Sequence, residues 1–315
     1  MKKILSIPVM LCMLFVACKK EANLRVPEGT LGNGPKEKLY PLKFTIGEFK
    51  QNFAKLSSAT SDSEPLTKYI SNLYYVLYDI DGSEIKRINY HSGDEGFGII
   101  TDTLPAGVYD AVLIGVNGDV LINGDRYGNE TKRKLHEGAG FELSHGISDE
   151  IKAYDTFFAR TTLNVEDEAV NSVISLERIV GGLEVNIQDA LPKNACRVRV
   201  SLTGEHYIFN FGNERSSEPF LEANIIQEIK SAEKGKENYK INAHVLNTYR
   251  PMLVKISCYD ENNNIIAEKT VANVKLERNK KLILTGKLFT PSPVTNGQVV
   301  YVNSDWIRET ETVSF

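Results

Sequence analysis

Short apolar runs separated by turn residues dominate the sequence after its first forty residues, and this pattern constrains the fold most. In LYYVLYDIDGSEIKRINYH, residues 73–91, two runs rich in β-branched and aromatic residues flank Asp81-Gly82. Asp-Gly suits the positive φ angles of a tight hairpin turn, so we expect two paired strands here. FGIITDTLPAGVYDAVLIGVNGD, residues 97–119, repeats the pattern around a Pro-Ala-Gly turn. The first half of the chain therefore predicts antiparallel sheets.

The second half of the chain has the same pattern of short apolar runs separated by turn residues. NNN at 262–264 predicts a hairpin turn, because asparagine tolerates left-handed backbone and hydrogen-bonds to its own chain. Helical periodicity is weak, and EANIIQEIKSAEKG (222–235) is the one segment where it suggests a helix. The runs expected to be strands are SVISLERIVGGLEVNIQDALP (172–192), CRVRVSL (196–202), HYIFNF (206–211), YKINAHVL (239–246), MLVKISCYD (252–260), NIIAEKTV (264–271) and KKLILTGKLF (280–289).

Chain length and an acidic interruption indicate two domains. The 315 residues exceed what one small core needs, and VEDEAVN breaks the strand pattern near 166–171. We therefore expect two β-sandwiches in series. The predicted segments are a signal peptide (1–17), a tether (18–40), an N-terminal domain (41–168) and a C-terminal domain (169–315).

The first twenty residues indicate export and a lipid anchor. Lys2 and Lys3 precede an apolar run that ends at Ala17, shorter than the roughly 20 residues of a membrane-spanning helix. Cys18 follows directly and resembles the lipidated cysteine of a bacterial lipobox, although Phe15 stands where leucine is preferred. Cys12 is a poor competitor because the large Leu11 precedes it. We expect cleavage before Cys18 and acylation of its thiol, which would make membrane lipid a partner of the chain.

The segment after Cys18 is expected to be a flexible tether. KKEANLRVPEGTLGNGPKEK, residues 19–38, is rich in glycine, proline and charge, and has few residues that could build a core. The formal net charge of the whole chain is −4, with no basic excess to neutralise phosphates. Nucleic acid is therefore not an expected partner.

Cys196 and Cys258 are the only other cysteines of the chain after cleavage. Both lie in runs expected to be strands. An oxidising envelope permits a disulfide between them, but the sequence does not show that they approach within bonding distance. Two buried free thiols are the alternative that we favour, and no nearby histidine suggests a nucleophile or a zinc site.

No motif for catalysis, a cofactor or a metal stands out. The five histidines are scattered, and neither a Gly-x-Ser-x-Gly elbow nor a phosphate loop occurs. The doubled Asn-Gly-Asp at 117–119 and 123–125 suits turns, with binding of calcium or of a partner as the functional alternative. Gly181-Gly182 lies inside a strand pattern and predicts a bulge or tight bend. We expect no enzyme, no cofactor and no metal.

Several segments resemble the fimbrillin-type lipoproteins of Bacteroidetes, in particular the fimbrial anchor or minor subunits. LPAGVYDAVLIGVNGD resembles that family's turn and long strand, and LERIVGGLEVNIQDALP resembles its Leu-x-Arg start to the second domain. VKLERNKKLILTGKLF resembles a late hairpin. VVYVNSDWIRETETVSF resembles the closing strands, with the single tryptophan Trp306. The resemblance spans most of the chain after Cys18.

The resemblance implies two tandem transthyretin-like β-sandwich domains on a lipidated tether, held at the outer membrane and exposed at the cell surface. It implies other fimbrial subunits as partners, joined by strand donation, with TVSF at the C-terminus or KFTIGEF near residue 43 as the donated or displaced strand. Shaft subunits of the family are cut after a basic residue. Arg25 is such a residue here, and an anchor should stay uncut.

The expected function is therefore that of a non-enzymatic fimbrial anchor or minor subunit in adhesion. The alternative is a surface lipoprotein that binds glycans, for which the 14 tyrosines would supply aromatic platforms. A ligand on a host or bacterial surface is compatible with either function. Trp306 in a strand is more typical of a core than of a platform.

Overall fold

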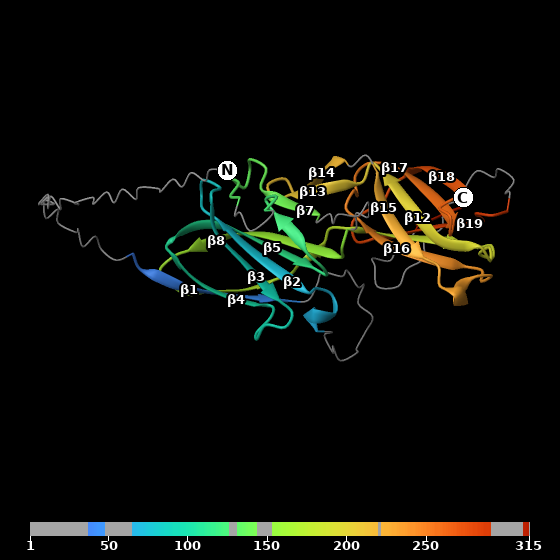
Figure 1. The fold of residues 1–315 in the computed structure, drawn as a ribbon. Coiled ribbons are helices and arrows are strands. Elements are labelled where there is room, and N and C mark those ends of the chain that lie inside the picture. The colour runs from blue at the N-terminus through green and yellow to red at the C-terminus, as the bar shows by residue number, and fades with distance from the viewer. Residues whose placement is uncertain are drawn as a thin grey trace, which may run out of the picture. The chain divides into compact units, whose positions relative to one another are not determined.

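The computed structural model describes residues 37–47, 65–125, 131–143, 153–219, 222–290 and 311–314. Figure 1 shows that strands build nearly all of the regular structure, so the expected all-β class is confirmed. The helices among the described residues are two short 3-10 turns, η1 (Leu66–Lys68) and η2 (Ser231–Glu233). Neither has the length and apolar character that crossing a membrane requires.

Sheet B is the five-stranded sheet of the first half. Its order is β10-β8-β5-β2-β3, and every pairing in it is antiparallel. Gly82, with φ at 75°, forms the turn between β2 and β3, as Asp81-Gly82 predicts. The strands are β2 (Asn72–Tyr78), β3 (Glu84–His91), β5 (Gly107–Val116), β8 (Thr156–Val165) and β10 (Glu177–Arg178).

Sheet B is covered on both faces, and β2 shows why its sequence is apolar without interruption. Successive side chains of a strand point to opposite faces. Tyr75 and Leu77 enter one core, whereas Tyr74 and Val76 enter another. A strand buried on both faces needs no polar alternation, which explains the run LYYVLY.

Sheet A covers one face of sheet B. Its order is β4-β1-β9, and β1 pairs antiparallel with β4 and parallel with β9. The strands are β1 (Leu39–Ile46), β4 (Ile99–Pro105) and β9 (Val170–Ile174). β1 begins within the range expected for the tether, and β9 lies beyond the expected domain boundary at 168.

Sheet C covers the other face of sheet B and combines strands from both halves of the sequence. Its order is β14-β13-β7-β6. Phe209 of β13 stacks on Phe141 of β7 with ring centroids 5.4 Å apart and meets Phe158 of sheet B edge-on at 5.0 Å. The strands are β6 (Val120–Ile122), β7 (Gly140–Leu143), β13 (His206–Asn210) and β14 (Arg215–Pro219).

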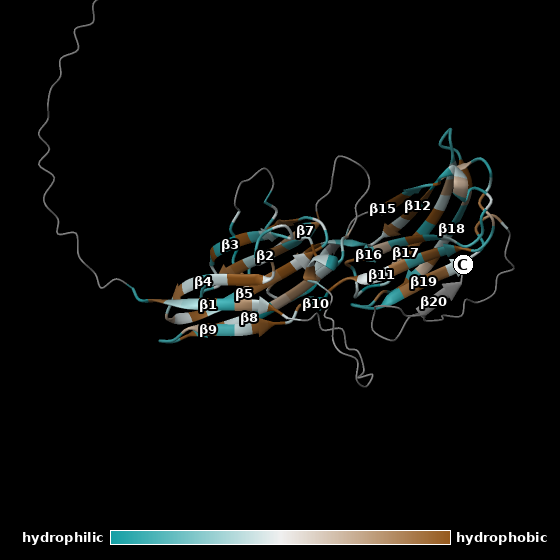
Figure 2. Cartoon of the chain, turned by 90° about the horizontal axis from the view of Figure 1, so that it is seen from below, coloured by the Kyte–Doolittle hydropathy of each residue, from teal (hydrophilic) through white to brown (hydrophobic). Residues whose placement is uncertain are grey.

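Sheets D and E enclose the third core, which belongs to the second half. Their orders are β15-β12-β17-β18 and β16-β11-β19-β20. Figure 2 shows hydrophilic and hydrophobic residues following one another along the strands of sheet D and along β11, β16 and β19, as expected for sheets with one buried face. The strands are β11 (Gly181–Ile187), β12 (Ala195–Thr203), β15 (Ala223–Glu228), β16 (Tyr239–Val245), β17 (Met252–Asp260), β18 (Ile265–Val274), β19 (Lys281–Gly286) and β20 (Glu311–Ser314).

Two details of the second half differ from what the sequence predicts. The segment 222–235 contains no α-helix: it forms β15 and η2, because Ala223 and Ile225 alternate into the core. Gly181-Gly182 makes no bulge, since β11 keeps a continuous register with β16 and β19. A Cβ at Gly181 would lie 3.0 Å from the carbonyl oxygen of Glu277, so close backbone approach explains this glycine.

Parallel pairing is a further difference. The sequence favours antiparallel sheets, yet β1 with β9, β11 with β19, and β19 with β20 pair in parallel. Parallel neighbours need a long connection, and each of these pairs is far enough apart along the chain to have one. Pairing also crosses the expected boundary at 168, because β13 joins β7. The division into two domains there stays a prediction.

Candidate assembly interface

β1 is the candidate for a strand that subunits exchange, and it lies in the middle of sheet A. Its inward residues Leu42 and Phe44 are fully buried, and the residues that follow each of them, Lys43 and Thr45, are exposed. The Phe44 ring lies 6.2 Å from the ring of Tyr75. Pro41 lacks an N–H, and it precedes the point where pairing with β9 begins. The described part of KFTIGEF is thus a fully integrated strand.

The groove that β1 fills is lined by sheets A and B. If β1 were absent, β4 and β9 would each present an unpaired edge, and apolar surface would meet water. The residues that pack in the same core include Leu73, Tyr75, Ile100, Leu104, Leu113 and Ile174. This groove has the properties that β-augmentation requires: two backbone edges and pockets for alternate side chains.

β20 is the second candidate, and its position is different. Its four residues pair in parallel with β19, from Leu282–Glu311 to Thr285–Ser314, at the end of the order of sheet E. Thr312, Val313 and Ser314 belong to the expected run TVSF, and Phe315 lies outside the described residues. The strand is held by one short ladder, whereas β1 is held by two longer ones.

Comparison with known proteins decides the family. A sequence model described as fimbrillin-A associated anchor proteins Mfa1 and Mfa2 matches residues 38–312. The chain belongs to this family of fimbrial anchor proteins. It therefore functions as a fimbrial anchor or minor subunit at the cell surface, among other fimbrial subunits. The predicted resemblance is confirmed.

Solved structures with related folds include three fimbrial proteins. The anchor protein Mfa2 from Porphyromonas gingivalis is 13% identical with a TM-score of 0.44, covering 74% of this chain and 82% of its own. The tip protein Mfa3 from the same organism is 10% identical with a TM-score of 0.39, covering 75% and 81%. A fimbrial assembly protein from Parabacteroides distasonis is 12% identical with a TM-score of 0.43, covering 88% and 98%. No curated protein matches the sequence.

The predicted lipid site of this fimbrial subunit cannot be placed in the fold. Cys18, the lipidation candidate, lies outside the described residues, as do Arg25 and Trp306. Acylation of Cys18 and cleavage at Arg25 therefore stay predictions.

Cys196 and Cys258 are free thiols on adjacent strands of sheet D. The Cys196 thiol donates to the carbonyl oxygen of Asp260 at 2.9 Å, where the register of β12 shifts by one residue. Cys258 is fully buried, and burial, together with the nearby Cys196, raises the pKa of its thiol to about 11. Such a thiol is a poor nucleophile at neutral pH. A disulfide between the two stays a prediction.

The doubled Asn-Gly-Asp is engaged in turns of the fimbrial subunit. Asp119 accepts a hydrogen bond from the Tyr74 hydroxyl, and Asp125 pairs with Arg87 at 3.3 Å. Asn123 has a φ of 55°, and its side chain bonds Glu84 at 2.8 Å and the backbone N–H of Gly140 at 3.0 Å. No group of three metal-ligating side chains gathers in the part of the chain that the structure describes.

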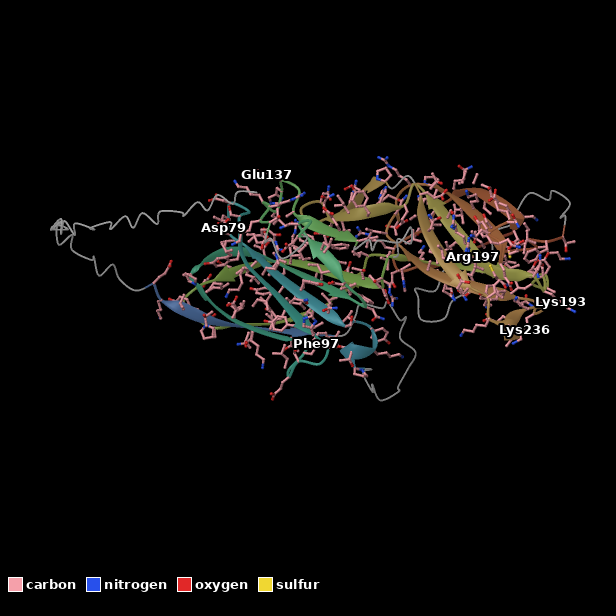
Figure 3. All side chains as sticks on the ribbon, viewed as in Figure 1. Asp79, Phe97, Glu137, Lys193, Arg197 and Lys236 are labelled. Atoms are coloured by element: carbon pink, nitrogen blue, oxygen red, sulfur yellow. The ribbon has the colours of Figure 1, made fainter. Side chains whose placement is uncertain are left out.

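The turn at Asp79 mimics part of a calcium loop in sequence, but its carboxylate caps the turn itself. Asp79 accepts the backbone N–H groups of Asp81 at 3.0 Å and Ser83 at 2.8 Å. Figure 3 labels Asp79 and Glu137, whose two loops meet where the Leu135 N–H donates to the Gly82 carbonyl at 2.8 Å. The geometry is that of an Asx turn in a hairpin.

Sequence reasoning missed the role of Arg178, although Leu-x-Arg marks it. Its guanidinium bonds both oxygens of Asp155, at 2.7 and 3.0 Å, and donates to Asn279 at 3.0 Å. It also lies 4.8 Å from the centre of the Phe157 ring. Asp155 directly precedes β8 in the first half of the sequence, and Asn279 lies in the turn between β18 and β19 in the second half. Arg178 therefore joins the two halves of the subunit.

Proposed function

We propose that the chain is a lipid-anchored fimbrial subunit of the outer membrane, held through acyl chains on Cys18 and active in assembly rather than catalysis. Family membership and the apolar run that ends at Cys18 support this proposal. Each buried methylene contributes about 0.8 kcal/mol to membrane binding, so several acyl chains together make release slow. A tether of residues 19–38 would let the folded body stand clear of the lipid surface.

We further propose that the subunit keeps β1 and donates its C-terminal segment to its neighbour. The position of β1 in the middle of sheet A supports this proposal. Releasing β1 would break ladders to β4 and β9 and expose Leu42 and Phe44, whereas releasing β20 breaks one four-residue ladder. A subunit whose groove stays filled can donate a strand but cannot accept one. It therefore occupies the end of a fibre, as an anchor must.

Metabolic labelling with a fatty acid tests the lipid anchor. Wild-type chain and Cys12→Ala should carry the label and sediment with outer membranes, whereas Cys18→Ala should lose the label and leave the membrane. Cys12→Ala is the matched control because Cys12 belongs to the same apolar run. Label retained by Cys18→Ala would refute lipidation at Cys18.

A disulfide lock tests which strand moves. Lys43 and Thr101 face each other across β1 and β4 and are both exposed, so Lys43→Cys with Thr101→Cys allows β1 to be fixed by oxidation. We expect the oxidised double variant to support attached fimbriae as well as wild type. Deletion of 311–315 should instead release fimbriae into the medium. A locked variant that assembles only after reduction would show that β1 is displaced.

The N-terminal residue of the mature chain distinguishes an anchor from a shaft subunit. An intact anchor starts at the acylated Cys18. Mass spectrometry that finds Val26 first would show cleavage after Arg25, which separates the lipid from the body, and would contradict the anchor assignment.

A further inference from the structure

A polar pocket of about 200 Å³ lies where sheet B meets two turns from the second half of the sequence. It is lined by Arg160 of β8, Ser175 and Glu177 around the start of β10, Glu214 between β13 and β14, and Arg278 between β18 and β19. None of these residues takes part in the strand pairing proposed for assembly. The pocket is therefore separate from the groove that β1 fills.

Both arginines of the pocket are held in place before any ligand arrives. Arg160 donates to the carbonyl oxygens of Phe211 at 3.3 Å and Gly212 at 2.9 Å, and its Nε lies 3.5 Å from the Glu214 carboxylate. Arg278 donates to the Glu214 carbonyl and to the Tyr249 hydroxyl. Side chains fixed in this way lose little conformational entropy when a ligand binds.

Glu214 is the unusual residue of the pocket. Its φ is 55°, in the left-handed region that a glutamate rarely adopts, where asparagine or glycine is more common. Backbone strain of this kind gathers at functional sites. Here the strained backbone places a carboxylate beside Arg160 and a carbonyl on Arg278.

The charges of the lining define the class of ligand. Two guanidiniums and the carboxylates of Glu177 and Glu214 cancel formally, so a free carboxylate or phosphate gains no net attraction. The lining is mainly polar, which disfavours an apolar ligand. Paired donors and acceptors suit vicinal hydroxyl groups, and the half-exposed ring of Tyr249 next to Arg278 adds an aromatic face.

We propose that this pocket binds one neutral sugar ring, such as a terminal hexose of a glycan, with its hydroxyl groups bridging Arg160, Glu214 and Arg278. The volume is on the order of that of one monosaccharide. The fimbrial subunit would thus carry a glycan-binding site on its body in addition to its role in assembly.

Saturation-transfer NMR on the mature lipidated chain in detergent tests the proposal. The probes are glucose, galactose, mannose, N-acetylglucosamine and fucose, with galacturonic acid and N-acetylneuraminic acid as charged comparators. At least one neutral sugar should bind with a dissociation constant below about 10 mM. Binding of the charged sugars alone, or of none, would overturn the assignment.

Three variants locate the binding. Ser175→Leu fills the pocket without removing a described contact, and Glu214→Gln removes one acceptor charge; each should weaken sugar binding at least about tenfold. Arg197→Gln is the matched control, because Arg197 lies on β12 in sheet D (Figure 3) and does not line the pocket. Thermal unfolding of each variant excludes misfolding. Unchanged binding in folded Ser175→Leu would show that the sugar sits elsewhere.

Discussion

Arg178 and Asn279 form a contact between residues 101 positions apart, and Asp155 completes the cluster. The Arg178 side chain is only 6% exposed, so its ion pair with Asp155 is shielded from solvent. Removing one member of a buried pair leaves the other charge without compensation. At the junction between the halves, one guanidinium therefore links Asp155 with Asn279, in addition to the pairing of β13 with β7.

Arg178→Ala should lower the free energy of unfolding by about 2–3 kcal/mol, because Asp155, whose side chain is 14% exposed, would lose its nearest cation. Urea denaturation measures this loss. Lys134→Ala is the control, since Lys134 is half-exposed and 4.0 Å from Glu137, and it should change stability by less than about 0.5 kcal/mol. Equal effects of the two substitutions would contradict a special role for Arg178.

Glu205 is a buried carboxyl group at the corner where the chain leaves β12 and enters β13. Burial raises its pKa to about 8, although the backbone N–H groups of Leu246, Asn247 and His206 bond it, Leu246 at 2.6 Å. The folded state therefore holds the proton more tightly than the unfolded state. This contribution to stability is complete below the unfolded pKa and is lost as pH rises from about 4.5 to about 8.

Glu205→Gln mimics the protonated group and should remove that pH dependence. Relative to wild type, the variant should gain about 1.4 kcal/mol of unfolding free energy per pH unit between pH 5.5 and 7.5, with no further change above 8.5. Denaturation at four pH values measures the difference. Glu137→Gln changes an exposed side chain, and its unfolding free energy should depend on pH in the same way as that of wild type. If Glu205→Gln had the same pH dependence of unfolding free energy as wild type, the pKa of Glu205 would not be raised.

At the scale of elements, the pairing of β7 with β13 depends on Gly140. A Cβ at this position would lie 2.3 Å from the carbonyl oxygen of Phe209, and backbone cannot move aside as a flexible side chain can. β13 must therefore shift away from β7, and the stacked rings of Phe141 and Phe209 with it. A glycine here therefore allows β13 to pair closely with β7.

Gly140→Ala should destabilise the subunit by about 2 kcal/mol or more. Gly93→Ala is the matched control because a Cβ there meets nothing within 4 Å, so its effect should lie within about 1 kcal/mol of zero. Thermal unfolding and protease sensitivity of the β13–β14 hairpin measure both. A Gly140→Ala protein as stable as the control would show that β13 is only loosely attached.

Local sequence signals predicted where strands and turns occur, but not which strands pair with each other. Asp81-Gly82 specified the β2–β3 hairpin, and NNN at 262–264 specified the β17–β18 turn, where Asn263 has a φ of 64°. HYIFNF was expected as a strand, but nothing in its alternation indicates that it pairs with β7. The pocket around Arg160 and Glu214 was equally hidden, because its residues come from distant segments that only the folded chain brings together.

Across the whole molecule, the described part of Lys38–Phe315 forms one compact unit. The core between sheets B and C contains Val76 and Phe141 from the first half with Phe209 and Leu246 from the second. Neither half can complete that core alone. Interleaving of this kind should couple the stability of the two halves.

Calorimetry of the intact chain should therefore show a single unfolding transition. Gly140→Ala should lower its midpoint without splitting it, because the substituted contact lies in the shared core. Two resolved transitions in wild type would contradict the coupling and would indicate halves that fold independently.

The position of β1 has a mechanical consequence for an anchored fibre. If the chain is held through Cys18 as proposed, tension from the membrane would enter the body where β1 begins, and a pull along β1 would run parallel to its ladders with β4 and β9. Hydrogen bonds arranged in this way are loaded in shear and share the force, whereas bonds at the end of a peeled strand fail one after another. Under such a pull, β1 would resist through two ladders at once.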